Sequence, residues 1–516
     1  MATYDADDVG GVRPAPPPPP PQAPSDWTSV VHASAWADLA RLGRWTGGSR
    51  VIPSGTDPSP FFAAVAPRSL GAGSTPAPIY VVVHGWAPGY LPLVQKAGGN
   101  VQWWSPGAQV AGRWASDWCW SPVAGSTISV DTTGVVQQVV AFDSTATVLA
   151  YSWIDDSATA SGVLNLSEVY RSEAYTHLNG IRLANALENA VAPSFFAAGG
   201  EIRLIGHSHG SRVGTVAAMT LQQRGHPATH LSILDSPEWD PTLAANGANL
   251  LAFYLEQLDI GDPSGSTGGL YVDSYASYFG VTYASAAPRS PIGNVVQVGL
   301  NPSPVYGSVD PSDCHTYAAA WYGGAAAGAA AAGDPPIGLA WPPVPAAHTP
   351  TINQRWGSPG QDQWLLTPGT SRYPTYRYAT HPLAVTKVAT QGPVSFTGGT
   401  LVLGPAGAGQ YTIFEGRYAA QHTDQYGIAF DLKWASPLPG TYFVVSIGHD
   451  GGSDTYTLLV LDGASLPTRA WTSIAINSDV WWATNASVRM YYWGIPQNPA
   501  DAVVVSNIRY VEVAGA

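Results

Sequence analysis

The sequence predicts an α/β protein, with a layered sheet and flanking helices, followed by a C-terminal all-β sandwich domain. Between residues 27 and 345, apolar strand candidates alternate with segments of helical periodicity, which is the pattern of a βαβ sheet. Between residues 381 and 516, short strands are separated by turn residues and no helical period interrupts them. The length of 516 residues is also enough for two or three domains.

The strand candidates of the first region are mostly continuous apolar runs, which is typical of parallel strands buried on both faces. In chain order they are 79–86, 146–153, 201–208, 230–236, 269–275 and 294–300. Two helices are predicted between them, over 168–191 and 211–224, because apolar and alanine residues recur there at helical spacing.

The remaining segments have biased compositions. Residues 1–26 are rich in proline, which predicts a disordered tail with extended polyproline II character. Residues 346–380 are rich in glycine and proline and are predicted to be a linker with ordered patches. No run is long and apolar enough for a transmembrane helix. The first twenty residues have neither the basic start nor the apolar stretch of a signal peptide, so the sequence leaves the cellular location open.

Charge is scarce in this chain. Only 11% of the residues are charged, against roughly 25% in an average soluble domain. The net charge is −13 and Lys and Arg form no cluster, so we expect no nucleic-acid partner. The 20 tryptophans and 25 tyrosines argue against disorder as the main state. A low-charge surface with many aromatic residues suits an uncharged, sparingly soluble substrate, and it also suits an extracellular protein.

The central motif is Gly206-His207-Ser208-His209-Gly210, a G-x-S-x-G pattern. It comes at the end of the apolar strand IRLIG and at the start of a predicted helix. This strand–turn–helix setting is typical of a nucleophile elbow, in which the glycines permit a tight turn that exposes the serine hydroxyl. We therefore predict Ser208 as a nucleophile, the alternative being a serine that only caps the helix.

A serine nucleophile needs a histidine to take its proton. His207 and His209 flank Ser208, but alternate positions on the turn point away from its hydroxyl. His315 follows the last apolar strand of the sheet after a long loop, and it keeps the chain order serine, acid, histidine. We predict His315 as the general base.

Two aspartates are candidates for the acid that orients this histidine. Asp273 ends the strand GLYVD, which is the next-to-last strand of the sheet, and Asp235 ends HLSILD, one strand earlier. Connection order favours Asp273, and Asp235 stays open as the alternative. Either residue can instead be a turn former.

Acyl transfer also needs N–H donors for the developing oxyanion. We predict the backbone N–H groups of His209, next to the nucleophile, and of Trp86, after the strand IYVVV. Trp103 and Trp104 are candidates for a substrate pocket, although aromatic residues are equally ordinary in a core. Cys119 and Cys314 can form one disulfide or remain two buried thiols.

These segments resemble the α/β-hydrolase superfamily, in particular its lipase and carboxylesterase branch. The resemblance rests on Val83–Trp86, Gly206–Gly210 and His315–Tyr322 and covers about residues 75–322. In addition, Leu234-Asp235-Ser236-Pro237 is similar to a segment of pancreatic-lipase-type enzymes in which the aspartate is the acid. This chain has Ser236 where that segment has proline, and it lacks the several disulfides of those enzymes. The resemblance implies an α/β-hydrolase fold and ester hydrolysis without a metal or cofactor.

Three functions follow as hypotheses. The first is a serine carboxylester hydrolase, a lipase or esterase of lipid metabolism, acting on uncharged lipidic or acyl esters. The second is a polyester depolymerase whose C-terminal domain binds the polymer. The third is a non-catalytic, hydrolase-like binding protein. Polymer or surface binding would use exposed aromatic residues of the C-terminal domain. The candidates are Trp434, Trp471, Trp481, Trp482, Tyr491, Tyr492 and Trp493.

Overall fold

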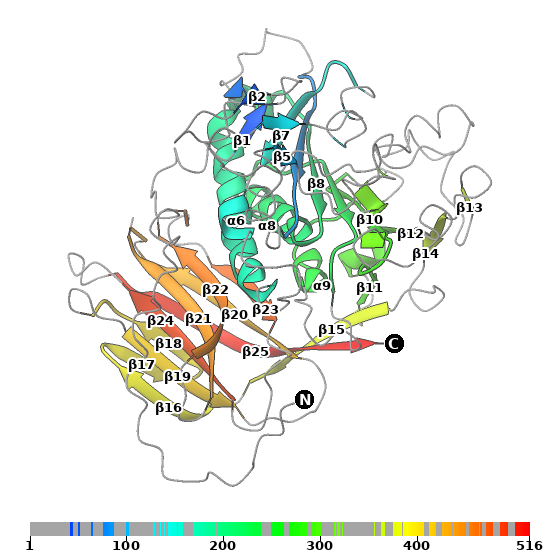
Figure 1. The fold of residues 1–516 in the computed structure, drawn as a ribbon. Helices are drawn as coiled ribbons and strands as arrows, with labels where there is room; N and C mark the ends of the chain where they lie inside the picture. Colours follow the sequence, from blue (N-terminus) through cyan, green and yellow to red (C-terminus); the bar gives the residue numbers. More distant parts are fainter. Residues whose placement is uncertain are drawn as a thin grey trace.

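The structure is a computed structural model of the chain, and it describes most of the predicted strands and helices (Figure 1). The described residues are 42–44, 50–51, 63–64, 76–86, 100–102, 127–129, 135, 139, 143–151, 153–157, 169–191, 193–238, 249–262, 268–285, 290–300, 314–315, 317–319, 322, 355–356, 363–366, 375–383, 385–406, 412–418, 426–435, 437–438, 440–449, 454–463, 465–466, 471–477, 486–493 and 501–515. The predicted proline-rich tail, residues 1–26, lies outside them.

The first region is built on a sheet of ten described strands in the order β13-β14-β12-β10-β9-β8-β4-β7-β1-β3. The strands are β1 (Leu42–Arg44), β3 (Ala63–Ala64), β4 (Ile79–Val83), β7 (Thr147–Tyr151), β8 (Ile202–His207), β9 (His230–Leu234), β10 (Tyr271–Ala276), β12 (Val296–Leu300), β13 (Arg355–Trp356) and β14 (Gln363–Leu366). From β7 to β12 all neighbours are parallel, and the flanking strands β1 and β14 are antiparallel. The apolar runs β4, β8 and β9 are almost wholly buried, as the sequence predicts.

Two long helices pack together beside this sheet, α6 (Val169–Ala190) and α8 (His209–Gln223). They lie next to each other in Figure 1. Their backbones approach closely because Gly180 has no side chain: a Cβ there would lie 2.5 Å from the Cβ of Val216. The shorter helices are α5 (Ile154–Ser157), α7 (Pro193–Ala197), α9 (Leu251–Leu255) and the 3₁₀ turn η3 (Pro291–Asn294). Among the described residues, no helix is long and apolar enough to span a membrane.

The C-terminal region is built on two sheets whose strand pairs are antiparallel, except that β11, from the first region, pairs in parallel with β15. The first has β11 (Thr282–Ser285), β15 (Thr375–Pro382), β17 (Val394–Thr397), β18 (Thr400–Leu403), β20 (Tyr426–Trp434), β23 (Thr472–Asn477) and β25 (Val503–Gly515). The second has β16 (Val385–Gln391), β19 (Thr412–Tyr418), β21 (Tyr442–His449), β22 (Asp454–Asp462) and β24 (Ala486–Trp493). A separate small sheet joins β2 (Arg50–Val51), β5 (Asn100–Gln102) and β6 (Thr127–Ser129). An α/β region followed by an all-β region is therefore confirmed.

Aromatic side chains fill the space between the two C-terminal sheets. Phe430 of β20 meets Phe443 of β21, and Trp434 of β20 meets Tyr492 of β24 in an edge-on contact. Trp434 and Tyr492 are buried, and so is Tyr491. These three aromatics therefore belong to the core, whereas Trp471 is 47% exposed. Trp493 is partly buried, and Trp481 and Trp482 lie outside the described residues.

The segment predicted as a linker, 346–380, contributes strands to both regions. β14 pairs with β12 at one side of the large sheet, and β13 pairs with β14. β15 pairs with β11, which follows β10 in the chain, and with the long C-terminal strand β25. The predicted linker with ordered patches thus contains strands that complete sheets on either side of it.

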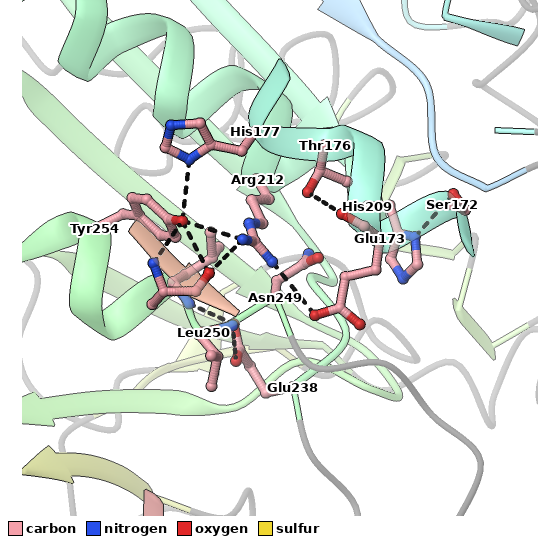
Figure 2. Close-up of polar contacts among 12 residues, drawn as sticks. Ser172, Glu173, Thr176, His177, His209, Arg212, Glu238, Asn249, Leu250 and Tyr254 are labelled. Atoms are coloured by element: carbon pink, nitrogen blue, oxygen red, sulfur yellow. Dashed lines mark hydrogen bonds and ion pairs between the residues drawn. The ribbon is translucent and has the colours of Figure 1, made fainter. Parts of the chain in front are cut away.

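Buried polar groups join the two regions. Arg182 of α6 forms an ion pair with Asp462 of β22 and another, at 3.2 Å, with Asp156. Tyr254 of α9 both donates to the carbonyl of Ala475 in β23 (3.0 Å) and accepts from its N–H (3.1 Å). Arg212 of α8 donates to the same carbonyl. Arg212 also donates to the hydroxyl of Tyr254 at 3.0 Å, and Figure 2 shows these two side chains together. The helix that follows the G-x-S-x-G motif therefore contacts the β region directly.

Candidate active site

Ser208 occupies a sharp turn between β8 and α8. Its φ and ψ angles are 55° and −133°, a backbone conformation that is costly for a residue with a side chain. The flanking glycines make the turn sterically possible. A Cβ on Gly206 would lie 2.5 Å from the carbonyl oxygen of Gly210, and a Cβ on Gly210 would lie 2.3 Å from that of His84. The strand β8, the strained residue Ser208 and the helix α8 thus follow one another in the order that the G-x-S-x-G motif predicts.

The segment after β4 runs directly past Ser208. A Cβ on Gly85 would lie 2.5 Å from the Cβ of Ser208 and 3.0 Å from its Oγ, so only glycine fits at this position. Trp86 is the next residue and is partly buried. The other predicted donor, the N–H of His209, belongs to the first residue of α8, where helical N–H groups lack partners within the helix. Gly85, the residue before Trp86, therefore contacts Ser208, and His209 follows the serine directly in the chain.

A buried histidine fixes the path of this segment. The Nε2 of His84 accepts a hydrogen bond from the backbone N–H of Trp153 at 3.1 Å. The indole N–H of Trp153 in turn donates to the carbonyl of His84 at 2.7 Å, and the two rings stack with centroids 5.5 Å apart. Because Trp153 follows β7, these contacts hold the end of β4 against the neighbouring strand. In the sequence, His84 is marked only by its place within the segment Val83–Trp86.

His315 pairs with Asp235. The Nδ1 of His315 lies 2.6 Å from the Oδ2 of Asp235, and both side chains are buried. The imidazole also packs on the ring of His207 (centroids 4.7 Å apart) and on the edge of Phe279 (4.9 Å). Since His207 immediately precedes Ser208, the histidine lies at the turn that carries the serine.

The preference for Asp273 as the partner of His315 is wrong. Asp273 instead contacts the Nε2 of His230 at 3.0 Å and accepts from the hydroxyl of Tyr275 at 2.7 Å. The reason is strand register: Asp273 is the third residue of β10 and pairs with Ser232 in mid-sheet. Asp235 comes directly after β9, so its carboxylate stands at the carboxyl end of the sheet, beside the motif. The alternative acid is therefore the one in contact with the histidine.

The Asp235 carboxylate is held by four backbone N–H groups as well as by His315. Its Oδ1 accepts from Ser277 (2.6 Å), Tyr278 (2.8 Å) and Gly280 (2.8 Å). Its Oδ2 accepts from Phe279 at 3.0 Å. Burial alone would raise the pKa of Asp235, but the hydrogen bond and charge of His315 and these N–H groups together bring it below its ordinary value. The carboxylate is thus ionised and fixed in position.

The two histidines of the motif have other tasks. The Nε2 of His207 contacts the backbone carbonyl of His315 at 3.2 Å, and the Nδ1 of His209 contacts the hydroxyl of Ser172 at 3.1 Å. Burial, with the nearby charge of His315, lowers the pKa of His207 to about 3. Burial, with the charge of Arg212, lowers the pKa of His209 to about 3. Both rings are therefore neutral near pH 7, and neither adds a positive charge beside Ser208.

Asn249, a polar residue that the sequence does not mark, contacts the turn at Ser208. The side-chain amide of Asn249 donates to the backbone carbonyl of Ser208 at 3.1 Å and to the hydroxyl of Ser236 at 2.7 Å. Asn249 precedes α9, and no motif marks it in the sequence. The predicted pocket residues Trp103 and Trp104 lie outside the described residues, as does Cys119. Cys314 is buried beside His315, and its pairing with Cys119 stays a prediction.

Comparisons with known proteins identify no family. No protein-family model and no curated protein matches the sequence. Among solved structures, the chain is similar to a family 29 carbohydrate-binding module from Piromyces equi, with 14% identity over 26% of this chain and 90% of that chain. It is also similar to a xylan-binding module, with 8% identity over 26% and 97%, and to a secreted serine protease from Vibrio cholerae, with 15% identity over 26% and 28%. The TM-scores are 0.19, 0.20 and 0.18.

Proposed function

We propose that this protein is a serine hydrolase of the α/β-hydrolase type that cleaves carboxylic esters. The observation that carries the proposal is the contact between His315 and Asp235 at the strained turn of Ser208. A serine at a positive φ between a parallel strand and a helix, beside a carboxylate-oriented histidine, is the arrangement that nucleophilic acyl transfer requires. The parallel strand order β7-β4-β8-β9-β10-β12, with the serine after β8, supports the same reading.

Each group has a defined task in the reaction. Asp235 accepts the Nδ1–H of His315, which leaves Nε2 as the nitrogen that can receive a proton. As the Ser208 hydroxyl attacks the ester carbonyl, its proton passes to Nε2 and the carbonyl oxygen becomes an oxyanion. The backbone N–H groups of His209 and Trp86 stabilise this oxyanion. The C–O bond then breaks, and the alcohol leaves with the proton from His315. Water next attacks the acyl group on Ser208 while His315 takes a proton from the water. The bond to Ser208 breaks, the serine regains the proton from His315, and the carboxylic acid leaves.

The surroundings favour a substrate without charge. The ionised carboxylate of Asp235 is enclosed by His315 and four backbone N–H groups, and the adjacent His207 and His209 are neutral near pH 7. Phe279 covers one side of the His315 ring. The whole chain carries few charges, with 11% charged residues. An uncharged acyl or lipidic ester meets these conditions better than a charged substrate does.

Hydrolysis of p-nitrophenyl acetate and butyrate tests this proposal. We expect turnover by the wild type and a loss of at least about 10³-fold in kcat for Ser208→Ala, because a triad serine accounts for most of the acceleration. Thr215→Ala is a matched control, since this buried hydroxyl of α8 donates to the carbonyl of Ser211 one turn earlier, within the helix itself. Equal rates in the wild type and Ser208→Ala would leave the non-catalytic binding protein as the better description.

Polymer binding by the C-terminal region is the second candidate function. Its supporting observation is Trp471, which is 47% exposed and lies beside Lys433 with the ammonium 5.9 Å from the ring centre. Exposed aromatic rings of this kind can stack on a polymer surface. Retention of the wild type, but not of Trp471→Ala, on an insoluble polyester would favour a depolymerase. Equal retention of both would argue against a binding role for Trp471.

A further inference from the structure

The backbone carbonyl of Ser208 is held from two directions. It accepts from the N–H of Ser211 at 2.9 Å, within the first turn of α8, and from the side-chain Nδ2 of Asn249 at 3.1 Å. Only the second bond comes from outside the helix. Because the amide nitrogen of Asn249 donates here, its orientation is fixed, and its Oδ1 is buried without a hydrogen-bond partner among the described residues.

This carbonyl belongs to the same peptide unit as the N–H of His209. In a trans peptide the C=O and N–H bonds point in opposite directions, and the unit is planar. A side chain that fixes the carbonyl of Ser208 therefore fixes the direction of the N–H of His209. A hydrogen bond to the carbonyl also polarises the N–H of that unit, which strengthens it as a donor.

Asn249 is itself firmly placed. Its own N–H donates to the carbonyl of Pro237 at 2.9 Å. The N–H groups of the next two residues, Leu250 and Leu251, donate to the buried carboxyl group of Glu238 at 3.0 Å and 3.2 Å. Figure 2 shows Asn249 beside Leu250 and Glu238. Pro237 and Glu238 follow Asp235 closely in the chain, so the stretch Asp235–Glu238 both carries the acid and supports Asn249.

We propose that Asn249 is a positioning residue for the oxyanion site: by holding the Ser208 carbonyl, it aims the N–H of His209 at the developing oxyanion. The inference rests on the proposed esterase function. It predicts that loss of the Asn249 amide lowers kcat, since the donor matters most when charge has formed on the substrate oxygen, and leaves KM nearly unchanged.

Ser236→Ala separates positioning from simple loop stabilisation. The Asn249 amide donates both to the Ser236 hydroxyl and to the Ser208 carbonyl, and Ser236→Ala removes only the first contact. Asn249→Ala removes both, and Asn249→Asp keeps the volume of the side chain while removing its donors. If Asn249 serves only to tie the loop, Ser236→Ala and the Asn249 variants should lose activity together.

The test compares three measurements between the variants and the wild type. These are kcat and KM for p-nitrophenyl butyrate, the Tm, and the inhibition constant of a trifluoromethyl ketone. Addition of the Ser208 hydroxyl to the carbonyl of this ketone places an oxyanion in the site. We expect about 10- to 100-fold lower kcat in the folded Asn249 variants, below the effect of deleting a donor outright. We also expect a parallel rise in the inhibition constant, KM within about 3-fold of the wild type, and nearly wild-type kcat for Ser236→Ala.

Several results would overturn the inference. These are an unchanged kcat in a folded Asn249 variant, an equal loss in Ser236→Ala, or a lower kcat without weaker inhibitor binding. Failure of both Asn249→Ala and Asn249→Asp to fold would assign the residue a structural task and would also overturn it. A wild-type protein that hydrolyses no ester would instead refute the proposed function.

Discussion

Replacement of Asp235 by asparagine is the sharpest perturbation of the proposed triad. The carboxylate accepts five hydrogen bonds, three at Oδ1 and two at Oδ2. The single oxygen of an asparagine fits best where it meets the three N–H groups of Ser277, Tyr278 and Gly280. Its NH₂ group then faces the N–H of Phe279 and the Nδ1 of His315. Because a donor now faces Nδ1, the histidine must carry its proton on Nε2 and can no longer accept one from the serine.

We therefore expect Asp235→Asn to lower kcat by about 10³- to 10⁴-fold, the effect of holding a triad histidine in the wrong tautomer. The assay is p-nitrophenyl butyrate hydrolysis, with circular dichroism to establish that the variant is folded. Asp273→Asn is the matched control: it too is a buried aspartate beside a histidine, but its partner is His230. A folded Asp235→Asn within 10-fold of wild-type kcat, or a greater loss in Asp273→Asn, would refute the assignment.

Three further predictions concern the nucleophile, the domain contact and pH. Gly85→Ala places a methyl group 2.5 Å from the Cβ of Ser208. Because this displaces the serine hydroxyl, we expect about a 100-fold loss in kcat/KM for ester hydrolysis. Gly293→Ala, where a Cβ meets nothing within 4 Å, is the control and should stay near the wild-type kcat/KM. Arg182→Met leaves two buried carboxylates without their cation, and urea unfolding should show a loss of about 3–5 kcal/mol; an unchanged midpoint would mean that this contact does not hold the regions together. Burial raises the pKa of Glu238 from its usual 4.5 to about 8, so the folded protein keeps a proton that the unfolded chain has released, and the free energy of unfolding should fall as pH rises from about 5 to 8. Glu238→Gln should flatten that fall, and an equal slope in both proteins would contradict the raised pKa.

The sequence predicts the parts of the site that depend on local chain geometry. The turn at Ser208 follows from two glycines between an apolar strand and a helix, and those glycines are sterically required in the structure. His315 follows from its position after the last strand of the parallel sheet. Both features can be predicted from the sequence, because each depends on residues close together in the chain or on strand order alone.

The acid and its supports depend on register, which the sequence does not reveal. β9 and β10 are parallel neighbours, and in the sequence the apolar run of each is followed directly by an aspartate. The choice between them turns on β10 continuing to Ala276, which places Asp273 in mid-sheet. The backbone N–H groups that hold Asp235 have no side-chain signature, and Asn249 lies far from the motif in the chain. The short strands β13 and β14 likewise sit in a segment whose composition indicates a linker.

The central claim is that Ser208 is an activated nucleophile, and covalent labelling tests it most directly. A fluorophosphonate should react once per chain, and mass spectrometry of the digested protein should place the phosphonyl group on the peptide that contains Ser208. The label should fall to background in His315→Ala, because the serine then has no base to take its proton. Absence of labelling in the folded wild type, labelling at another residue, or full labelling of His315→Ala would contradict the account.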